Sequence, residues 1–353
     1  MPGPDRSNNP QPPNAARPLI PGRVAFLHDP QHHAHHGPLD HPERPQRLDA
    51  ILEHLDITGR RARYDLLTPD DLPADRFPDQ GQARHAELER CHPRPYLDAF
   101  ADTCVAERPY FMSPDTPITG DSETIARRAS ALALHAAHCA LTHDPSASSS
   151  FRAFCAVRPP GHHATAEQAM GFCFFNHAAL VADLLAIGGR RVAVFDFDVH
   201  HGNGTQALTY DRDDILFLST HEDPHRQYPG SGHAHETGQP GTPGHGFTVN
   251  QPLPTGTGDD AFLAALDEHI LPRLADFVPD ALVFSAGFDA HHDDPLGGLN
   301  LTTACFHELT KRTLAALPDA EHATPVVSLL EGGYDTKALA ESVAAHLDAL
   351  EDR

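Results

Sequence analysis

No stretch of the 353-residue chain approaches the length and apolarity of a membrane span, and the N-terminus lacks a charged-then-apolar signal pattern. We therefore expect a cytoplasmic protein without a membrane partner. Lysine is almost absent, with only Lys311 and Lys337, a bias that we attribute to the source genome rather than to function. The six cysteines contain no CxxC pair, which favours reduced thiols over disulfides or a cysteine zinc site.

Positive charge is scarce. There are 26 lysines and arginines against 49 aspartates and glutamates, a formal net charge of −23. This balance argues against direct DNA or RNA binding, because phosphates would be repelled. The same field would attract cationic substrates, such as basic peptide tails or polyamines.

The length and the 40% hydrophobic content suffice for one large α/β domain, expected over residues 21–353. Residues 1–20, rich in proline and asparagine, are predicted to be a disordered tail. Six short apolar runs alternate with amphipathic segments, which predicts a doubly wound, mostly parallel sheet with helices on both faces and long catalytic loops at the strand C-terminal ends. We expect the strands at 24–28, 151–157, 192–199, 215–220, 281–288 and 326–330, and the helices at 45–55, 121–141, 176–187, 259–277 (kinked near Pro272), 302–317 and 335–350.

The stretch RVAVFDFDVHHGNGTQ, residues 191–206, sets carboxylates into an apolar strand. Alternate residues of a strand share a face, so Asp196, Asp198 and His200 are expected to point the same way. Burying such carboxylates unpaired costs on the order of several kcal/mol each, so a cation should lie against them. Asp198 and His200 can offer an oxygen and a nitrogen to one metal ion.

Polar side chains also follow the other predicted strands. They are the tandem His162 and His163, then His221, Asp289 and Tyr334. Ligands of open α/β sheets bind beyond the carboxyl ends of the strands, so these groups should meet at one edge. The pattern predicts a metallohydrolase. Most of the 28 histidines do not follow a strand, and the cluster His32, His33, His35 and His36 is predicted to lie in a solvated loop.

The motifs RPPGHHA, GFCFFN, DFDVHHGNGTQ, SAGFDAHHDDPLGG and EGGY occur in this order. The set strongly resembles the histone deacetylase family, most of all its class II-like and bacterial branch, which includes acetylpolyamine amidohydrolases. HPERPQRL resembles the first motif of that family. The resemblance spans roughly residues 22–345. It implies the arginase/deacetylase fold, one catalytic zinc and hydrolysis of an N-acetyl amide.

By this resemblance, Asp198, His200 and Asp289 are the expected zinc ligands, although iron in place of zinc stays open. Three protein ligands with one open position are typical of a catalytic zinc. Two carboxylates make the ion a weaker Lewis acid than three histidines would, so Tyr334 is expected to donate a hydrogen bond to the developing oxyanion.

The pair His162 and His163 resembles the family's histidine pair. We assign His163 as the general base that takes a proton from the attacking water and later protonates the leaving amine, and His162 as an electrostatic partner. Asp196 and Asn203 match the groups that orient these two histidines. Because Asn203 is neutral where some relatives have aspartate, His163 should be less basic.

Other positions resemble family sites more loosely. Phe172 and Tyr228 are expected to form the walls of a narrow acyl-lysine tunnel. Its further substrate-binding residues are Gly171, Leu296 near the rim and Asp115, which would grip the substrate backbone. Arg47 resembles an arginine of the cavity through which acetate leaves. Ser219 and Thr220, together with Asp196, Asp198 and His200, resemble a buried potassium site.

The leading expectation is a zinc-dependent deacetylase acting on acetyl-lysine in proteins or peptides. Leu296 favours this substrate, because polyamine-selective relatives place a carboxylate at the tunnel mouth. The alternatives are an acetylpolyamine amidohydrolase, a binuclear manganese ureohydrolase and a non-catalytic acyl-ligand binder. The DFDVHHG motif lacks the additional bridging aspartates of the ureohydrolases, and the presence of Tyr334 and His163 argues against the binder. A homo-oligomer is compatible with the sequence, and the loop 229–246 would be either a substrate-entry lip or an oligomer contact.

Overall fold

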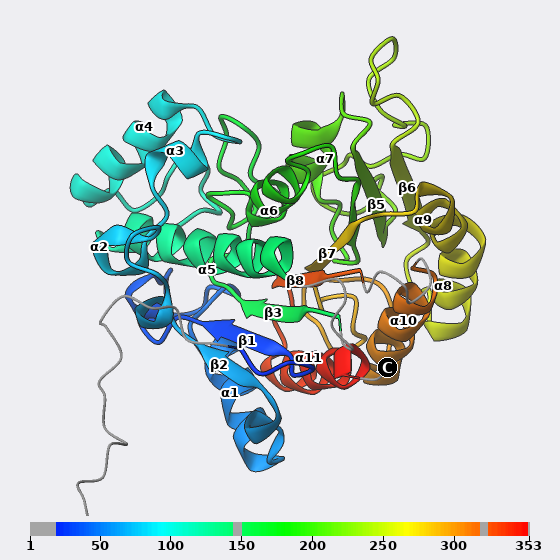
Figure 1. The fold of residues 1–353 in the computed structure, drawn as a ribbon, viewed down its shortest axis with the longest axis horizontal. Helices are drawn as coiled ribbons and strands as arrows, with labels where there is room; N and C mark the ends of the chain where they lie inside the picture. The colour runs from blue at the N-terminus through cyan, green and yellow to red at the C-terminus, as the bar shows by residue number, and fades with distance from the viewer. Residues whose placement is uncertain (1–18, 144–149, 318–323, 352–353) are drawn as a thin grey trace, which may run out of the picture.

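A computed structural model describes residues 19–143, 150–317 and 324–351. Its centre is one eight-stranded sheet of order β2-β1-β3-β8-β7-β4-β5-β6, in which every pairing is parallel (Figure 1). The expected α/β fold with a parallel sheet is therefore confirmed. The strands are β1 (Ala25–His28), β2 (Asp65–Leu67), β3 (Arg152–Ala156), β4 (Val192–Asp196), β5 (Ile215–Glu222), β6 (Thr248–Leu253), β7 (Ala281–Ala286) and β8 (Val326–Leu330).

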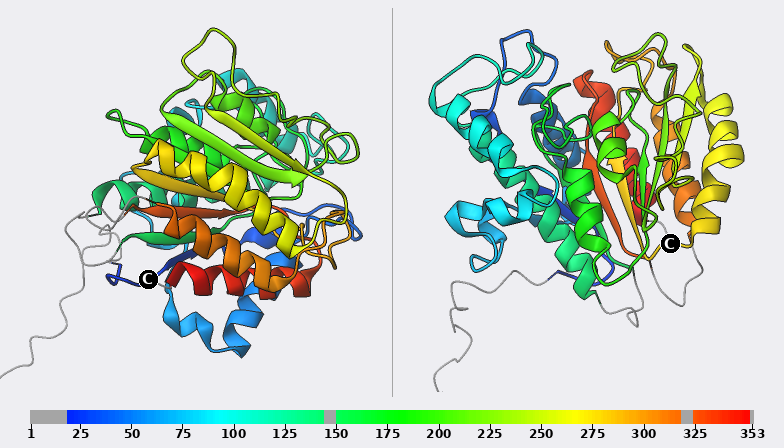
Figure 2. Two further views of the ribbon diagram at one scale, coloured as in Figure 1. Left: turned by 90° about the vertical axis from the view of Figure 1, so that its right-hand side faces the viewer. Right: turned by 90° about the horizontal axis from the view of Figure 1, so that it is seen from above.

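Helices cover both faces of the sheet (Figures 1 and 2). One apolar core lies between the sheet and α4 (Arg94–Val105), α5 (Ser122–Thr142) and α6 (His177–Leu185). The other lies between the sheet and the remaining long helices, of which the yellow, orange and red ones run side by side in the left view of Figure 2. These are α1 (Gln46–Ile57), α8 (Asp259–Ala265), α9 (Leu271–Phe277), α10 (Thr303–Ala315) and α11 (Thr336–Glu351).

Strand β4 shows why two-sided apolar runs give this arrangement. Val192 and Val194 belong to the core beneath α5 and α6, whereas Ala193 and Phe195 belong to the opposite core. Alternate residues of a strand point to opposite faces, so a strand covered on both sides needs apolar residues at every position. Shorter elements connect the layers: η1 (His32–Ala34), η2 (Arg60–Arg63), η3 (Pro69–Asp71), α2 (Pro78–Gly81), α3 (His85–Leu88) and α7 (Asn203–Thr209).

Most helix ends agree with the sequence. The side chain of Asn176 accepts a hydrogen bond from the backbone N–H of Ala179, and Asp335 accepts one from Ala338. Asp121 occupies the N-cap position of α5 but makes no capping hydrogen bond through its side chain. The helix predicted to be interrupted or kinked near Pro272 is interrupted by a π-helical turn, Leu266–Ile270, which ends two residues before the proline. Proline lacks an N–H and clashes with the preceding turn, and a wide turn accommodates both effects.

Three expectations need correction. Strand β4 ends at Asp196, three residues before the predicted end, and strands β2 and β6 were not predicted. The histidine cluster is not a solvated loop throughout, because His32 and His35 are buried. Of the predicted tail 1–20, residues 1–18 lie outside the described residues. Within the described part of the chain, none of the helices has the length and apolar character needed to cross a membrane.

Candidate functional site

The candidate site lies where the central strands end. Asp196, the last residue of β4, is in register with Ser219 of β5 on one side and with Ser285 of β7 on the other. Asp198 and His200 follow β4 as loop residues, and Asp289 follows β7. Because the strands are parallel, their carboxyl ends share one edge, and this brings together residues far apart in the sequence.

Asp198, His200 and Asp289 form one compact group. All three are buried, and one potential ligand atom from each lies within 4.8 Å of the others. The Nδ1 atom of His200 is 3.0 Å from Oδ1 of Asp198 and 3.1 Å from Oδ2 of Asp289. Burial, followed by the charge of Asp198, raises the pKa of Asp289 to about 7. Two buried carboxylates and an imidazole at this spacing fit a divalent ion with an open coordination position.

The surrounding backbone supports this interpretation. The N–H of Gly332 donates to Oδ2 of Asp198 at 2.8 Å, and that of Val199 donates to Oδ1 of Asp289 at 2.9 Å. A Cβ atom at Gly332 would overlap with both carboxylates. Glycine at position 332 therefore leaves room for the two carboxylates and for an ion bound to them. The backbone N–H groups of Gly332 and Val199 orient the carboxylate side chains.

The tandem histidines lie beside this group. Nδ1 of His162 is 3.0 Å from Oδ2 of Asp196, and Nδ1 of His163 is 2.7 Å from Oδ1 of Asn203. Burial opposes protonation of His162, but Asp198 and Asp196 raise its pKa to about 10. Burial, and then the charges of His162 and His200, hold the pKa of His163 well below its usual value. The two carboxylates thus favour the charged form of His162, whereas the surroundings of His163 favour its neutral form.

Glu331 is a buried member of the site that our sequence reasoning did not single out. Its Oε2 accepts hydrogen bonds from the backbone N–H groups of Gly161 and His162, and its Oε1 accepts one from the hydroxyl of Ser285. It therefore holds the loop that carries the histidine pair. Its position directly after β8, in the EGGY motif, was the available signal.

A cavity of about 240 Å³ opens onto these groups. All five predicted substrate-binding residues line it, together with His163, His200 and Tyr334 and one residue not predicted, Gln227. The predicted ones are Asp115, Gly171, Phe172, Tyr228 and Leu296. The arrangement is that of a small, mostly apolar pocket with a few convergent polar groups, as in enzyme active sites.

Tyr334 is fixed by contacts around its ring. The ring lies edge-on to Phe172, with the ring centroids 5.7 Å apart, and the guanidinium of Arg47 lies 4.9 Å from its centroid. Its backbone N–H donates to Oδ2 of Asp294 at 2.6 Å. Burial raises the pKa of the Tyr334 hydroxyl well above its usual value. The hydroxyl therefore stays protonated and can donate a hydrogen bond.

Arg47 is fully buried beneath this turn. It donates to the carbonyl oxygens of Gly333 at 2.6 Å and Glu331 at 2.5 Å, and it pairs with Glu43 at 3.3 Å. Glu43 pairs in turn with the buried Arg158 at 2.6 Å. The expected cavity arginine is thus part of a buried ionic network that supports the Tyr334 turn.

Two residues of the predicted potassium site, Ser219 and Thr220, lie on β5. Ser219 Oγ is 2.8 Å from Nδ1 of His221. The hydroxyl of Thr220 is buried without a hydrogen-bond partner among the described residues. A buried, unpartnered oxygen is uncommon, and a bound cation or water would satisfy it.

The backbone also shapes the cavity wall. Gly171 and Phe172 both have positive φ angles, of 55° and 69°. A Cβ atom on Gly171 would overlap with the imidazole of His163 and approach the ring of Tyr228. Only glycine therefore allows the chain to pass so close to His163.

Gly171→Ala should consequently impair the site. We expect the added methyl group to displace His163. If His163 is the general base that the sequence predicts, kcat/KM should fall by at least about 10-fold, the cost of a misplaced reacting group. Steady-state kinetics of the purified variant test this. Gly256→Ala, which has a φ of 83° but open space around its Cβ position, is the matched control for backbone strain. Equal losses in both variants would contradict the steric argument.

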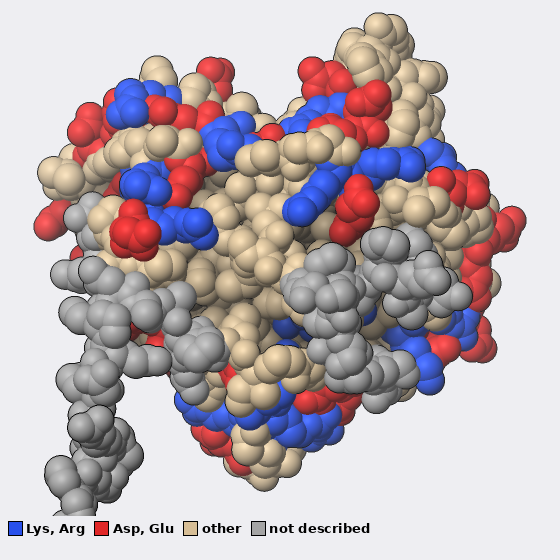
Figure 3. All heavy atoms as spheres, viewed as in Figure 1, with Lys and Arg blue, Asp and Glu red and all other residues tan. Residues whose placement is uncertain are grey.

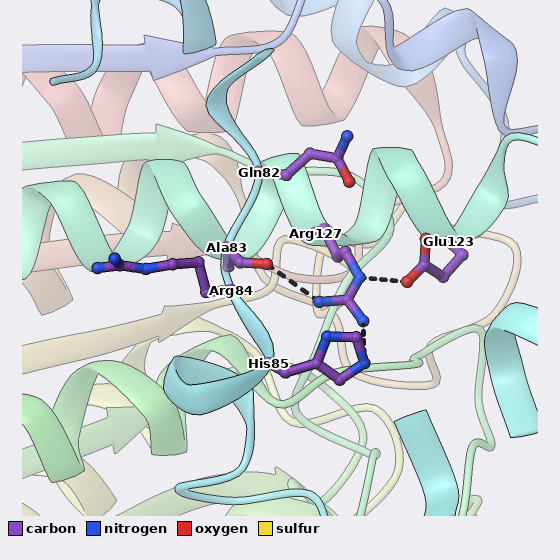
Figure 4. Close-up of a pocket in the computed structure, with 6 residues that line it drawn as sticks. All are labelled: Gln82, Ala83, Arg84, His85, Glu123 and Arg127. Carbon is purple, nitrogen blue, oxygen red and sulfur yellow. Dashed lines mark hydrogen bonds and ion pairs between the residues drawn. The ribbon is translucent and has the colours of Figure 1, made fainter. Parts of the chain in front are cut away.

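A second cavity, of about 320 Å³, lies near the start of α5 (Figure 4). Its central Arg127 donates to Glu123, to the carbonyl oxygen of Ala83 and to His85. The cavity contains none of the predicted site residues, and its arginine already has protein partners. The candidate active site is therefore the smaller cavity.

Comparisons with known proteins agree with this geometry. Residues 41–350 match the histone deacetylase domain family. The chain is 37% identical to a histone deacetylase-like amidohydrolase of Pseudomonas aeruginosa over 84% of this chain and 73% of that protein. It spans about half the length of other curated relatives, such as 42% of a chloroplastic histone deacetylase 10 of Oryza sativa, to which it is 47% identical over 54% of its own length.

Two solved structures are similar over 93% of this chain. One is the crystal structure of the HDA15 HD domain, with a TM-score of 0.80, 30% identity and 88% of that chain covered. The other is an acetylpolyamine aminohydrolase from Burkholderia pseudomallei, with a TM-score of 0.76, 28% identity and 98% coverage.

Proposed function

The chain belongs to the histone deacetylase family of hydrolases, and from this premise we propose that it is a zinc-dependent deacetylase acting on acetyl-lysine in proteins or peptides. One observation carries the proposal. The buried group Asp198, His200 and Asp289 adjoins a cavity that is also lined by His163 and Tyr334. A metal-binding group, a neutral imidazole and a protonated phenol at one cavity are what amide hydrolysis requires.

When bound, the ion would polarise the amide carbonyl and make a water molecule more acidic. His163 is oriented by Asn203, which accepts from its Nδ1–H and leaves Nε2 free to take a proton. It removes that proton from the attacking water and delivers it to the amine nitrogen as the C–N bond breaks. Tyr334 donates its hydroxyl hydrogen to the carbonyl oxygen as negative charge develops there.

The cavity walls suit a slender, mostly apolar chain. Phe172 and Tyr228 would enclose the methylene groups of lysine, and Leu296 offers no charge to a distant ammonium group. Asp115 accepts from the N–H of Gly171 with one carboxylate oxygen, while its Oδ1 is buried without a hydrogen-bond partner within residues 19–143, 150–317 and 324–351. We propose that this oxygen accepts a hydrogen bond from the substrate backbone.

Acetylated polyamines are the second candidate substrate. The free carboxylate oxygen of Asp115 and the net charge of −23 would both attract a cationic polyamine. A non-catalytic acyl-ligand binder is the alternative of another class. Metal-loaded protein that is inert toward every acyl amide tested would support that alternative and overturn the deacetylase proposal.

A substrate panel separates these candidates. We expect kcat/KM to be higher on acetyl-lysine peptides than on acetylspermidine or acetylputrescine. Leu296→Glu should shift the ratio toward the polyamines by up to about fivefold, the effect of one exposed ion pair. Leu296→Gln controls for polarity without charge. A wild-type preference for the polyamines would overturn the proposed substrate.

The remaining assignments follow the same proposal. We place potassium beside Asp196, Ser219 and Thr220, acetate release near Arg47, and the enzyme in the cytoplasm as one catalytic domain over residues 21–353. Acidic and basic side chains are interleaved on the face shown in Figure 3, without a continuous basic surface among the described residues there. This agrees with a substrate other than nucleic acid.

A further inference from the structure

A second group of potential metal ligands lies away from the cavity, between η1 and the first turn of α1. It consists of His32, His33 and Asp49, whose ligand atoms lie within 4.8 Å of one another. Nε2 of His32 is 3.3 Å and Nε2 of His33 is 3.0 Å from Oδ1 of Asp49. The side chain of His32 is only 4% exposed, whereas those of His33 and Asp49 are 56% and 43% exposed. The group is therefore anchored inside the protein and open to solvent on one side.

The hydrogen bond of the His32 ring determines which ring nitrogen has a lone pair available to a metal ion. Nδ1 is 2.8 Å from the carbonyl oxygen of Asp29, and since that oxygen can only accept, Nδ1 carries the hydrogen. Nε2 is then an acceptor in the neutral ring, and it is buried without a hydrogen-bond partner in the part of the chain that the structure describes. It faces a carboxylate oxygen, which is also an acceptor. The same carboxylate oxygen is 3.0 Å from Nε2 of His33, so a cation among the three atoms would bring both imidazoles and the carboxylate to one centre.

The orientation of the His32 ring suits a metal ion at this position. A divalent transition metal binds a neutral imidazole whose other nitrogen donates a hydrogen bond to a carbonyl oxygen, as Nδ1 of His32 donates to that of Asp29. The spacing also fits, because ligands about 2.0–2.1 Å from a tetrahedral zinc ion lie about 3.3 Å apart.

We propose that His32, His33 and Asp49 bind a divalent transition-metal ion such as Zn²⁺, at a site separate from the catalytic one. The ion joins η1 to α1. That junction is close to the buried network under the active site, because the carbonyl oxygen of His32 accepts a hydrogen bond from Arg158 at 2.7 Å. Arg158 in turn pairs with Glu43.

The group His291, His292 and Asp293 has a similar composition but is a weaker candidate for a metal site. Its His292 and Asp293 side chains are exposed, and Nδ1 of His291 already accepts a hydrogen bond from the backbone N–H of Asp293. One nitrogen of its buried histidine is therefore already used, whereas Nε2 of His32 has no hydrogen-bond partner among the described residues. It serves as the internal comparison for the proposed site.

The test measures bound zinc in the full-length protein, by equilibrium dialysis at buffered free Zn²⁺ followed by elemental analysis. We expect two equivalents in the wild type and one in His33→Ala, whose exposed side chain can be removed without disturbing the core. Asp49→Asn, which keeps the side-chain size, should lose the same equivalent. In both variants the affinity at this site should fall by more than about 100-fold, beyond the loss caused by removing an outer-shell partner.

Two variants serve as controls. His36→Ala removes an exposed histidine of the same segment, and His292→Ala disables the comparison group; both should retain two equivalents. Zinc should also raise the melting temperature of wild type and His36→Ala more than that of His33→Ala, since binding to the folded state stabilises it. One equivalent in the wild type, unchanged zinc in His33→Ala, or equal losses in all the histidine variants would overturn the proposal.

Discussion

Asp289→Ala is expected to remove one equivalent of bound divalent metal and to reduce amide hydrolysis by more than about 100-fold, since even outer-shell partners of a metal are worth about 10- to 100-fold. Asp289 is fully buried and supplies one of the two carboxylates next to Nδ1 of His200. Without it, Asp198 and His200 alone would hold the ion. Elemental analysis and steady-state kinetics on the same preparation measure both effects.

The matched control is Asp293→Ala, a nearby aspartate that is largely exposed. It should retain both metal and turnover. Circular dichroism must show that Asp289→Ala is folded, because that variant leaves the N–H of Val199 without its acceptor. A folded, metal-free variant with wild-type turnover would exclude the proposed metal chemistry. Retained metal would show that Asp289 is not a ligand.

Tyr334→Phe should lower kcat by about 10²- to 10³-fold, the cost of removing one donor to a developing oxyanion. Phenylalanine keeps the edge-on contact with Phe172 and the contact with Arg47, so only the hydroxyl group is lost. Zinc content should therefore remain at the wild-type value. Measuring kcat and KM separately tests the role, because a donor that acts only in the transition state affects kcat.

Tyr110→Phe provides the control, because it removes a hydroxyl from an exposed tyrosine outside the cavity lining. It should leave kcat unchanged. A kcat within twofold of wild type in Tyr334→Phe would contradict the assignment. A fall in zinc content together with kcat would show a structural role for the hydroxyl instead.

Much of this site could be predicted because its residues follow strands. Asp198, His200 and Asp289 come directly after apolar runs, and a parallel sheet brings such positions to one edge whatever their separation in sequence. The prediction of where they gather did not depend on the end of β4. That strand is three residues shorter than expected, yet Phe197 and Val199 remain in the core while Asp198 points to the site.

Residues whose role depends on tertiary contacts could not be predicted in this way. Glu43 and Arg158 carry no local signal, because their pairing joins segments 115 residues apart. The same holds for His32, where a run of histidines beside proline and glycine indicated a solvated loop. Its burial results from tertiary contacts of η1, including packing against α5, which the hydrophobic pattern of the segment does not reveal.

The contacts of Arg47 have a consequence for how the protein is assembled. This residue lies on the first long helix, and the carbonyl groups it holds belong to the turn after the last strand, 284 and 286 residues later. Contacts between residues so far apart in sequence form late, because the entropy of closing the loop must be lost before the contact can stabilise the fold. The ribosome must therefore synthesise the chain beyond Gly333 before Arg47 can make these hydrogen bonds, so the support beneath Tyr334 forms late.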